Sequence, residues 1–507
     1  MGQEMTRSKK LLLNTGSALV YQVITLVCGF VLPKFIIPYF GSAANGLISS
    51  ITQFLTIITL CECGVGAVVQ SALYKPLADK SDRGISEVVI SSNRFFNKIV
   101  RILIVYVVVL MIVYPIIIRD EFSYVYTAAM VLILSLSYFA QYYLFLTYRL
   151  LLNADQLSFI QLGAHSLALI LNTIFTVVLI KLGSSVHIVK LGSVAAFLIQ
   201  PLIIKLYVDR HYHINLKLPL TKEPLKQKWN GLAQHIASVV QGNVATVVLT
   251  VFSTLENISI YSVYYLVAHG IRQVIVSLNT GIKAMLGNML AKNETDTLNK
   301  TFSTVEFAFH TLVTLLFSIT GILILPFVRI YTVNFTDALY IQPLFGALMV
   351  IGQAVYCLRI PYEMIIQAAG HYKQTQASSI IEAVINIIVA VALVLMLGLE
   401  GVAISTIAAM GYRTVYLAFY IRGNILNRPI SHFVKHLLVD AVCVVLMIAA
   451  TCWIDMYPTT YYQWLGFAAI VSLICCSVSF IINTIVYKRE VKYAIMLILR
   501  SSRKEKK

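Results

Sequence analysis

Long stretches of apolar residues follow one another along the chain, separated by short segments that carry charge. Ile102–Ile118 contains no charged residue, and Ile380–Leu397 contains only Glu382. A helix needs about 20 mostly apolar residues to cross the hydrocarbon core of a bilayer. Repeated stretches of this kind predict an all-α, polytopic membrane protein.

Windows of about 20 residues predict about fourteen membrane-spanning helices. The first window, Leu11–Leu32, is long enough to span and has no small-residue cleavage site after it, so it predicts a retained helix. The windows centre on residues 11–32, 46–73, 101–118, 123–147, 157–180, 186–206, 231–254, 258–285, 302–330, 338–367, 375–397, 400–421, 432–453 and 462–486.

A short internal similarity indicates a repeat. Leu77-Ala78 follows the second window and Leu290-Ala291 follows the eighth, and each pair precedes a charged segment. Two pseudo-symmetric six-helix lobes, related by an axis along the membrane normal, predict a transporter that alternates between inward-open and outward-open states. The expected domains are an N-terminal six-helix lobe (1–206), a cytoplasmic amphipathic linker (207–230), a second six-helix lobe (231–421), two additional transmembrane helices (422–486) and a basic cytoplasmic tail (487–507).

Lysine and arginine gather in alternate connections between the windows. One set includes the clusters near both termini, and it is expected in the cytoplasm because positive residues mark cytoplasmic loops. The net charge of +17 then reflects topology, and no nucleic-acid partner is expected. The other set holds little beyond Lys34, Arg119, Lys181 and Arg329.

Composition and motifs exclude several classes. Only 12% of residues are charged, about half the usual share of a soluble protein, which excludes a soluble enzyme. The chain has no G-x-x-x-x-G-K-[ST] phosphate loop, so an ATP-driven pump would need a separate subunit. No loop is long enough for a catalytic domain, so we expect no enzymatic activity. The eight cysteines form no metal or disulfide pattern, and neither a metal nor a cofactor is expected.

Polar residues inside the predicted spans are the candidate functional residues, because charge in hydrocarbon is costly and usually faces a cavity. Arg272 has no acidic residue three or four positions away, and His269 shares its helical face. An unpaired arginine favours an anionic ligand. Gln22 and Asn243 are further polar candidates for the cavity.

Other charges in the spans have two interpretations. Arg359 and Arg413 are cavity candidates, but Arg359 also has Glu363 at i+4, which predicts a self-neutralising pair, and Arg413 could extend to the interface. Glu62, Glu363 and Glu382 are candidates for binding a coupling ion. His165 and His235 are interpreted as packing residues.

Several short sequence motifs, together with the predicted helix arrangement, are similar to those of a known family of membrane proteins. They are Val31-Leu32-Pro33, Tyr39-Phe40-Gly41 and Asn45-Gly46-Leu47 near the second window, Gly64-Val65-Gly66 within it, Ile258 to Tyr265 at the start of the eighth, and Ala368 to Lys373 before the eleventh. With them the chain resembles the oligosaccharide flippases (Wzx-type polysaccharide biosynthesis proteins) of the multidrug/oligosaccharidyl-lipid/polysaccharide exporter superfamily.

This resemblance implies a flippase in the bacterial cytoplasmic membrane for an undecaprenyl-pyrophosphate-linked oligosaccharide. The head group would enter a cationic cavity between the lobes, where Arg272 matches the expected cavity arginine and Lys34 lies near the outer end of the first span. A polysaccharide polymerase and chain-length machinery are candidate partners, and we expect a monomer.

Two other hypotheses remain open at this point. A cation-coupled multidrug exporter of the same superfamily predicts about twelve spans and carboxylates in the first lobe, which Glu62 could supply. An integral-membrane enzyme such as a polysaccharide polymerase predicts a large external loop, and the chain has none.

Overall fold

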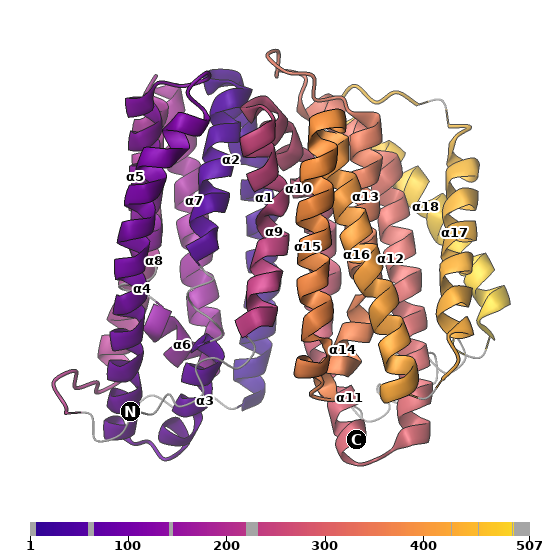
Figure 1. The fold of residues 1–507 in the computed structure, drawn as a ribbon, viewed down its shortest axis with the longest axis horizontal. Coiled ribbons are helices and arrows are strands. Elements are labelled where there is room, and N and C mark those ends of the chain that lie inside the picture. The colour runs from indigo at the N-terminus through magenta and orange to yellow at the C-terminus, as the bar shows by residue number, and fades with distance from the viewer. Residues whose placement is uncertain are drawn as a thin grey trace. The chain divides into compact units, whose positions relative to one another are not determined.

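The computed structural model in Figure 1 describes residues 7–58, 65–140, 146–219, 232–426, 428–454, 456–488 and 490. Within these ranges the regular elements are helices, and no strand occurs. Among the described residues, ten helices are long and apolar enough to cross a membrane. The chain is therefore a multi-pass membrane protein, as its hydrophobic pattern predicts.

The chain divides into two compact units, Met1–Ser259 and Ile260–Lys507. In the first unit α7 packs on both α8 and α1, and α4 packs on α5. Its helices are α1 (Arg7–Phe40), α2 (Ser42–Thr56), α3 (Val65–Ala78), α4 (Asp82–Ile117), α5 (Tyr124–Ala140), α6 (Leu146–Ala154), α7 (Ser158–Lys181), α8 (Val186–His211), α9 (Leu232–Phe252) and the start of α10 (Leu255–Ser277).

In the second unit α15 and α13 pack on α16, and α12 packs on α13. The last two helices cover α12 through a buried apolar cluster that includes Leu323, Met447 and Val471. Beyond the rest of α10, the helices of this unit are α11 (Asn279–Ala291), α12 (Thr295–Tyr331), α13 (Pro343–Leu358), α14 (Ile360–Ala368), α15 (Tyr372–Leu397), α16 (Leu399–Asn424), α17 (Ser431–Thr451) and α18 (Tyr461–Val486).

Several predicted spans are interrupted in the structure. The window 338–367 divides into α13 and α14 at Arg359, where Pro361 occupies the first turn of α14 and lacks the N–H that would continue the helix. The window 258–285 divides into α10 and α11 at Leu278. Because three windows, 46–73, 123–147 and 231–254, include residues outside the described ranges, the count of fourteen spans stays a prediction.

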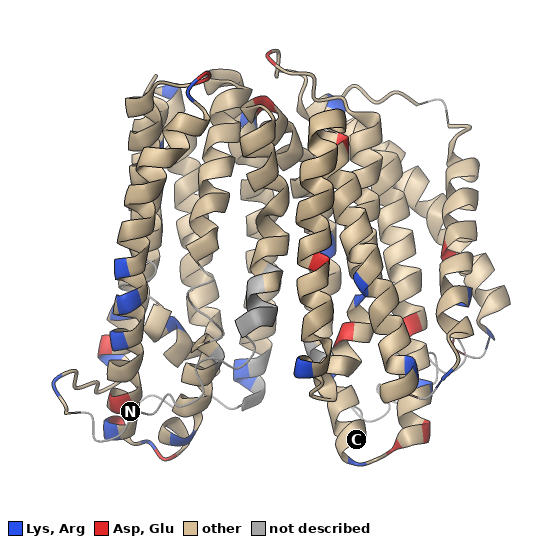
Figure 2. Cartoon of the chain, viewed as in Figure 1, with Lys and Arg blue, Asp and Glu red and all other residues tan. Residues whose placement is uncertain are grey.

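Charge is confined mostly to the ends of the helices. Figure 2 shows long uncharged stretches in both units and many charged residues near the helix ends, while the second unit also carries charged residues midway along its helices. At one such end Lys10 Nζ lies 3.0 Å from Asp155 Oδ1, and the Tyr212 hydroxyl donates to Asp155 Oδ2 over 2.5 Å. Burial and the neighbouring Asp155 carboxylate raise the pKa of Tyr212, so this phenol stays a hydrogen-bond donor.

Candidate functional site

A cavity of about 440 Å³ lies inside the first unit. Its wall is built from α1, α2, α5, α6, α7 and α8, and its volume falls in the usual range for small-molecule sites. The lining residues are Tyr21, Ile48, Thr52, Leu134, Ser137, Tyr138, Arg149, Gln161, Leu162, His165, Asn172, Lys190, Ser193, Val194, Phe197, Gln200 and Pro201.

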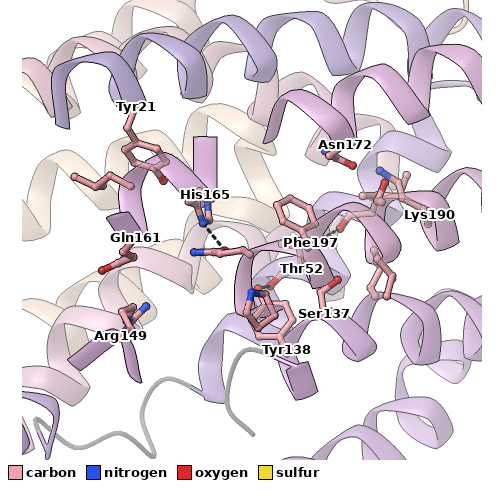
Figure 3. Close-up of a pocket in the computed structure, with 17 residues that line it drawn as sticks. Tyr21, Thr52, Ser137, Tyr138, Arg149, Gln161, His165, Asn172, Lys190 and Phe197 are labelled. Atoms are coloured by element: carbon pink, nitrogen blue, oxygen red, sulfur yellow. Dashed lines mark hydrogen bonds between the residues drawn. The ribbon is translucent and has the colours of Figure 1, made fainter. Parts of the chain in front are cut away.

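Two cationic side chains line this cavity. Figure 3 shows Arg149 and Lys190 at opposite ends of the labelled set, with His165 and Phe197 between them. Lys190 is only 8% exposed, and no hydrogen bond or ion pair joins it to any residue that the structure describes. A buried ammonium without a hydrogen-bond acceptor is costly. A ligand that supplies an acceptor or a negative charge to Lys190 would therefore be stabilised in this cavity.

The rest of the wall offers hydrogen bonds and aromatic faces. His165 Nδ1 lies 2.8 Å from Gln200 Oε1, and the Tyr21 ring meets the His165 ring edge-on at 5.2 Å. Asn172 is buried, and its Oδ1 has no hydrogen-bond partner within the described part of the chain. None of the lining residues is acidic. The cavity therefore suits a polar ligand that carries negative charge.

The second unit has a separate cationic group at Arg272 on α10. Its Nη1 donates to Gln353 Oε1 over 3.2 Å, and its guanidinium lies 3.5 Å from the centroid of the Tyr356 ring. No carboxylate pairs with Arg272 in the described ranges, and its buried Nε has no partner there. His269 stacks on Tyr265 one turn away, at 4.7 Å. The role of Arg272 and His269 in binding substrate stays a prediction.

The remaining charged candidates of this unit neutralise one another. Arg359 contacts Glu363 at 3.1 Å and Glu382 at 2.6 Å, and Arg413 contacts the same two carboxylates at 3.3 and 2.7 Å. Both arginines and Glu382 are buried. The predicted Arg359–Glu363 helix pair is thus confirmed as part of a larger group of four, whereas Arg413 is buried and does not extend to an interface. A role of these residues in binding substrate or an ion stays a prediction.

Three other candidates are dispersed in the first unit. Gln22 follows the cavity residue Tyr21 on α1 but does not line the cavity. Lys34 lies half-buried further along the same helix. Asn243 is buried on α9, where its Nδ2 donates to the Val239 carbonyl over 2.7 Å. Glu62 lies outside the described residues, as does the side chain of His235.

The sequence prediction missed Lys190 and Arg149, and it assigned His165 to packing. The window 186–206 contains two lysines, Lys190 near its start and Lys205 near its end, and the rule that an intramembrane charge marks a cavity would have singled out Lys190. The pairing of His165 with Gln200 joins α7 to α8 and has no signal in the spacing of the sequence.

No protein-family model matches the chain, and no curated protein matches it in sequence. Solved structures share its fold. A lipid II flippase MurJ in the inward closed conformation aligns with a TM-score of 0.67, covering 95% of this chain and 100% of that one at 17% identity. A multidrug resistance MATE family transporter of the MOP superfamily aligns in its inward-facing conformation with a TM-score of 0.57, covering 80% of this chain and 95% of that one at 13% identity.

The outward-facing conformation of such a MATE family transporter gives a TM-score of 0.54, over 85% of this chain and 98% of that one, also at 13% identity. At these identities the likeness establishes the fold. Two kinds of membrane transporter, a lipid II flippase and a multidrug resistance MATE family transporter, use this arrangement of helices.

Proposed function

We propose that the chain is a transporter that moves an undecaprenyl-pyrophosphate-linked oligosaccharide repeat unit from the cytoplasmic to the outer leaflet by alternating access. It would act in the bacterial cytoplasmic membrane with both termini in the cytoplasm. A polysaccharide polymerase and chain-length machinery would then consume the flipped repeat unit. The fold shared with a lipid II flippase supports a substrate of this kind.

The observation that carries the proposal is the distribution of unpaired charge. Lys190, which faces a cavity, and Arg272 have no carboxylate partner in the described ranges. The buried carboxylate Glu382, in contrast, contacts both Arg359 and Arg413. A site for an anion needs unsatisfied cations, whereas a site for a cation needs unsatisfied carboxylates.

The two cationic groups differ in a way that suits a phosphate-bearing glycan. The guanidinium of Arg272 is planar and offers paired donors that match phosphate oxygens. The Lys190 cavity adds amide side chains and aromatic faces, such as those of Gln200 and Tyr21, which suit sugar hydroxyls and ring C–H groups. The Arg272 group thus suits a pyrophosphate, and the Lys190 cavity suits sugars.

The decisive experiment is deletion of the gene in its host, followed by mass spectrometry of the undecaprenyl-linked lipids. We expect a complete pyrophosphate-linked repeat unit to accumulate while the surface polysaccharide is lost. Restoration by the wild-type chain, but not by the Arg272→Ala variant, would attribute the effect to transport. Unchanged lipids with normal surface glycan would contradict the proposal.

A cation-coupled multidrug exporter is the second candidate, favoured by the fold shared with the MATE family transporters. It predicts that the deletion strain becomes sensitive to lipophilic cations while its lipid-linked glycans stay normal. In proteoliposomes it also predicts drug transport that depends on a carboxylate, for which Glu62 is the candidate. Loss of that transport in the Glu62→Gln variant would favour the exporter.

A further inference from the structure

A chain of four titratable side chains crosses three helices of the second unit. The Asp440 carboxylate of α17 lies 2.5 Å from Nδ1 of His310 on α12. Nε2 of His310 lies 3.2 Å from the hydroxyl of Tyr362 on α14, and that hydroxyl lies 2.6 Å from Oε1 of Glu306, again on α12. Glu306, His310 and Tyr362 are buried, and the Asp440 side chain is 15% exposed.

Each of these three contacts needs one hydrogen between its two heavy atoms. Ionised Asp440 and Glu306 only accept, a neutral imidazole carries one N–H, and Tyr362 carries one O–H. Two hydrogens are therefore available for three contacts. One contact would place two acceptors against each other, at a cost comparable to an unmade buried hydrogen bond, unless the chain holds one additional proton.

That proton can sit on His310, giving an imidazolium that donates from both ring nitrogens, or on either carboxyl. In each case three hydrogens are available for the three contacts. The charge balance agrees with it, because Arg428 Nη2 contacts Glu306 at 2.5 Å and supplies one positive charge against two carboxylates. One bound proton makes the group neutral.

The neighbouring helices contribute further titratable groups. His436 stacks on His310 at 4.8 Å, and its Nδ1 lies 2.8 Å from the Tyr487 hydroxyl. Its Nε2 is 3.6 Å from Glu306 Oε2, too far for a hydrogen bond. A second imidazolium stacked on the first would be repelled, so a single proton satisfies the pair. Arg428 contacts Glu306, Cys443 interacts electrostatically with Asp440, and Lys435 lies over the Tyr487 ring.

We propose that Asp440, His310, Tyr362 and Glu306 form a proton-binding site that controls how α17 packs on α12. With the proton bound, all three contacts are satisfied and α17 is held through Asp440. Release of the proton leaves an acceptor–acceptor contact and a net negative charge in a buried place, which loosens α17. This site is independent of which substrate the transporter carries.

The proton can be located with ¹⁵N-histidine NMR and infrared spectroscopy of the full chain in lipid nanodiscs at about pH 7.5, where an unperturbed histidine is neutral. We expect either a doubly protonated His310 ring or a carboxylic acid band. Asp440→Asn should abolish that signal, because the asparagine Nδ2 donates to the ring and leaves all three contacts satisfied without an extra proton.

His371 is the matched control, since its Nδ1 bonds the Tyr420 hydroxyl at 2.9 Å and none of the ion pairs among the described residues includes it. His371→Gln should leave the signal unchanged. A neutral His310 ring together with no carboxylic acid band in the wild-type spectra would overturn the proposal, and this result does not depend on whether a variant folds.

The effect on α17 can be followed by hydrogen–deuterium exchange between about pH 6 and pH 9, a range that spans histidine titration, after correction for the intrinsic rate. We expect exchange in α17 to increase as the pH rises, while α15 of the same unit stays constant. In Asp440→Asn the increase should disappear. Exchange in α17 that is independent of pH in the wild type would exclude the control of packing.

Discussion

Gly46 shows how a single residue can set the distance between two segments. A Cβ atom at this position would lie 1.8 Å from the Leu255 carbonyl oxygen, where α10 begins. Next to it, Asn45 Nδ2 donates to Ser259 Oγ over 2.8 Å, which fixes α2 against the same part of α10. Because glycine has no Cβ, the backbone at Gly46 can approach Leu255 this closely. In the Asn45-Gly46 pair, the glycine thus permits the contact and the asparagine provides a hydrogen bond across it.

The first prediction is that Gly46→Ala destabilises the protein strongly, because the added methyl would overlap main-chain atoms that cannot move independently. We expect the thermal unfolding temperature in detergent to fall by several degrees or more. Gly163→Ala on α7 is the matched control, since nothing lies within 4 Å of its Cβ position. If both variants unfold at the wild-type temperature, the close approach to Leu255 is not required.

The second prediction concerns Lys190. Replacement by glutamine removes the charge and retains a polar side chain, so affinity for an anionic lipid-linked glycan should fall about 10- to 100-fold, the range expected for one charge-assisted hydrogen bond. Lys190→Arg should retain part of the affinity. Binding can be measured by thermal stabilisation or by a labelled substrate analogue.

The exposed Lys181 at the end of α7 provides the control for total charge. Lys181→Gln should bind as the wild type does. Equal binding by Lys190→Gln and the wild type would mean that the cavity does not hold the anionic group.

At the scale of helices, the group of two arginines and two glutamates joins α14, α15 and α16. Arg359 precedes α14, Glu363 lies within it, Glu382 lies on α15 and Arg413 on α16. The four side chains balance in charge and are largely shielded from solvent. Removal of one member leaves a buried charge without its partner and lowers the stability of the fold strongly. The intact ion pair, in contrast, adds little stability compared with apolar residues of similar size.

The third prediction is therefore that Arg413→Gln costs about 3–5 kcal/mol of stability. The double variant Arg413→Gln/Glu382→Gln should lose less than the sum of the two single variants, because it removes opposite charges together. Arg422→Gln, on the exposed side of the same helix, should be nearly neutral. Additive losses in the double variant, measured by chemical or thermal unfolding, would argue against coupling in this group.

These elements also show what the sequence could predict. Apolar windows located the helices well, since burial in lipid imposes length and composition on each span. The Arg359–Glu363 pair was predictable because the two residues are four positions apart on one helical face. The contact of Arg413 with Glu382 joins residues 31 positions apart, and it depends on how α15 packs against α16. No local pattern records that packing.

The same limit explains what was missed in the site. Lys190 was detectable as a charge in an apolar window, but its cavity is made by six helices whose side-chain arrangement the sequence does not display. The chain of Asp440, His310, Tyr362 and Glu306 combines three helices that are far apart in sequence. Long-range side-chain contacts of this kind appear only after the helices have been assembled.

At the scale of the whole molecule, this fold is shared by a lipid II flippase and a multidrug resistance transporter, so the fold alone does not identify the substrate. The charge of the binding residues can distinguish an anionic from a cationic substrate. The fourth prediction uses Arg272 for this purpose. In proteoliposomes, Arg272→Ala should reduce translocation of an anionic lipid-linked glycan at least tenfold while the protein remains folded. Arg272→Lys should recover part of the rate, since a point charge replaces a planar fork of donors.

If the chain exports lipophilic cations, Arg272→Ala should not reduce transport, because removal of an unpaired positive charge would leave cation transport unchanged or increase it. Arg329→Ala, at the exposed end of α12, controls for total charge and should affect neither substrate. Measuring both substrates with these three variants separates the hypotheses by whether Arg272→Ala lowers the transport rate, and this comparison does not require the sugar composition. Full glycan translocation by Arg272→Ala would show that this arginine serves packing against Tyr356 and Gln353 instead of binding.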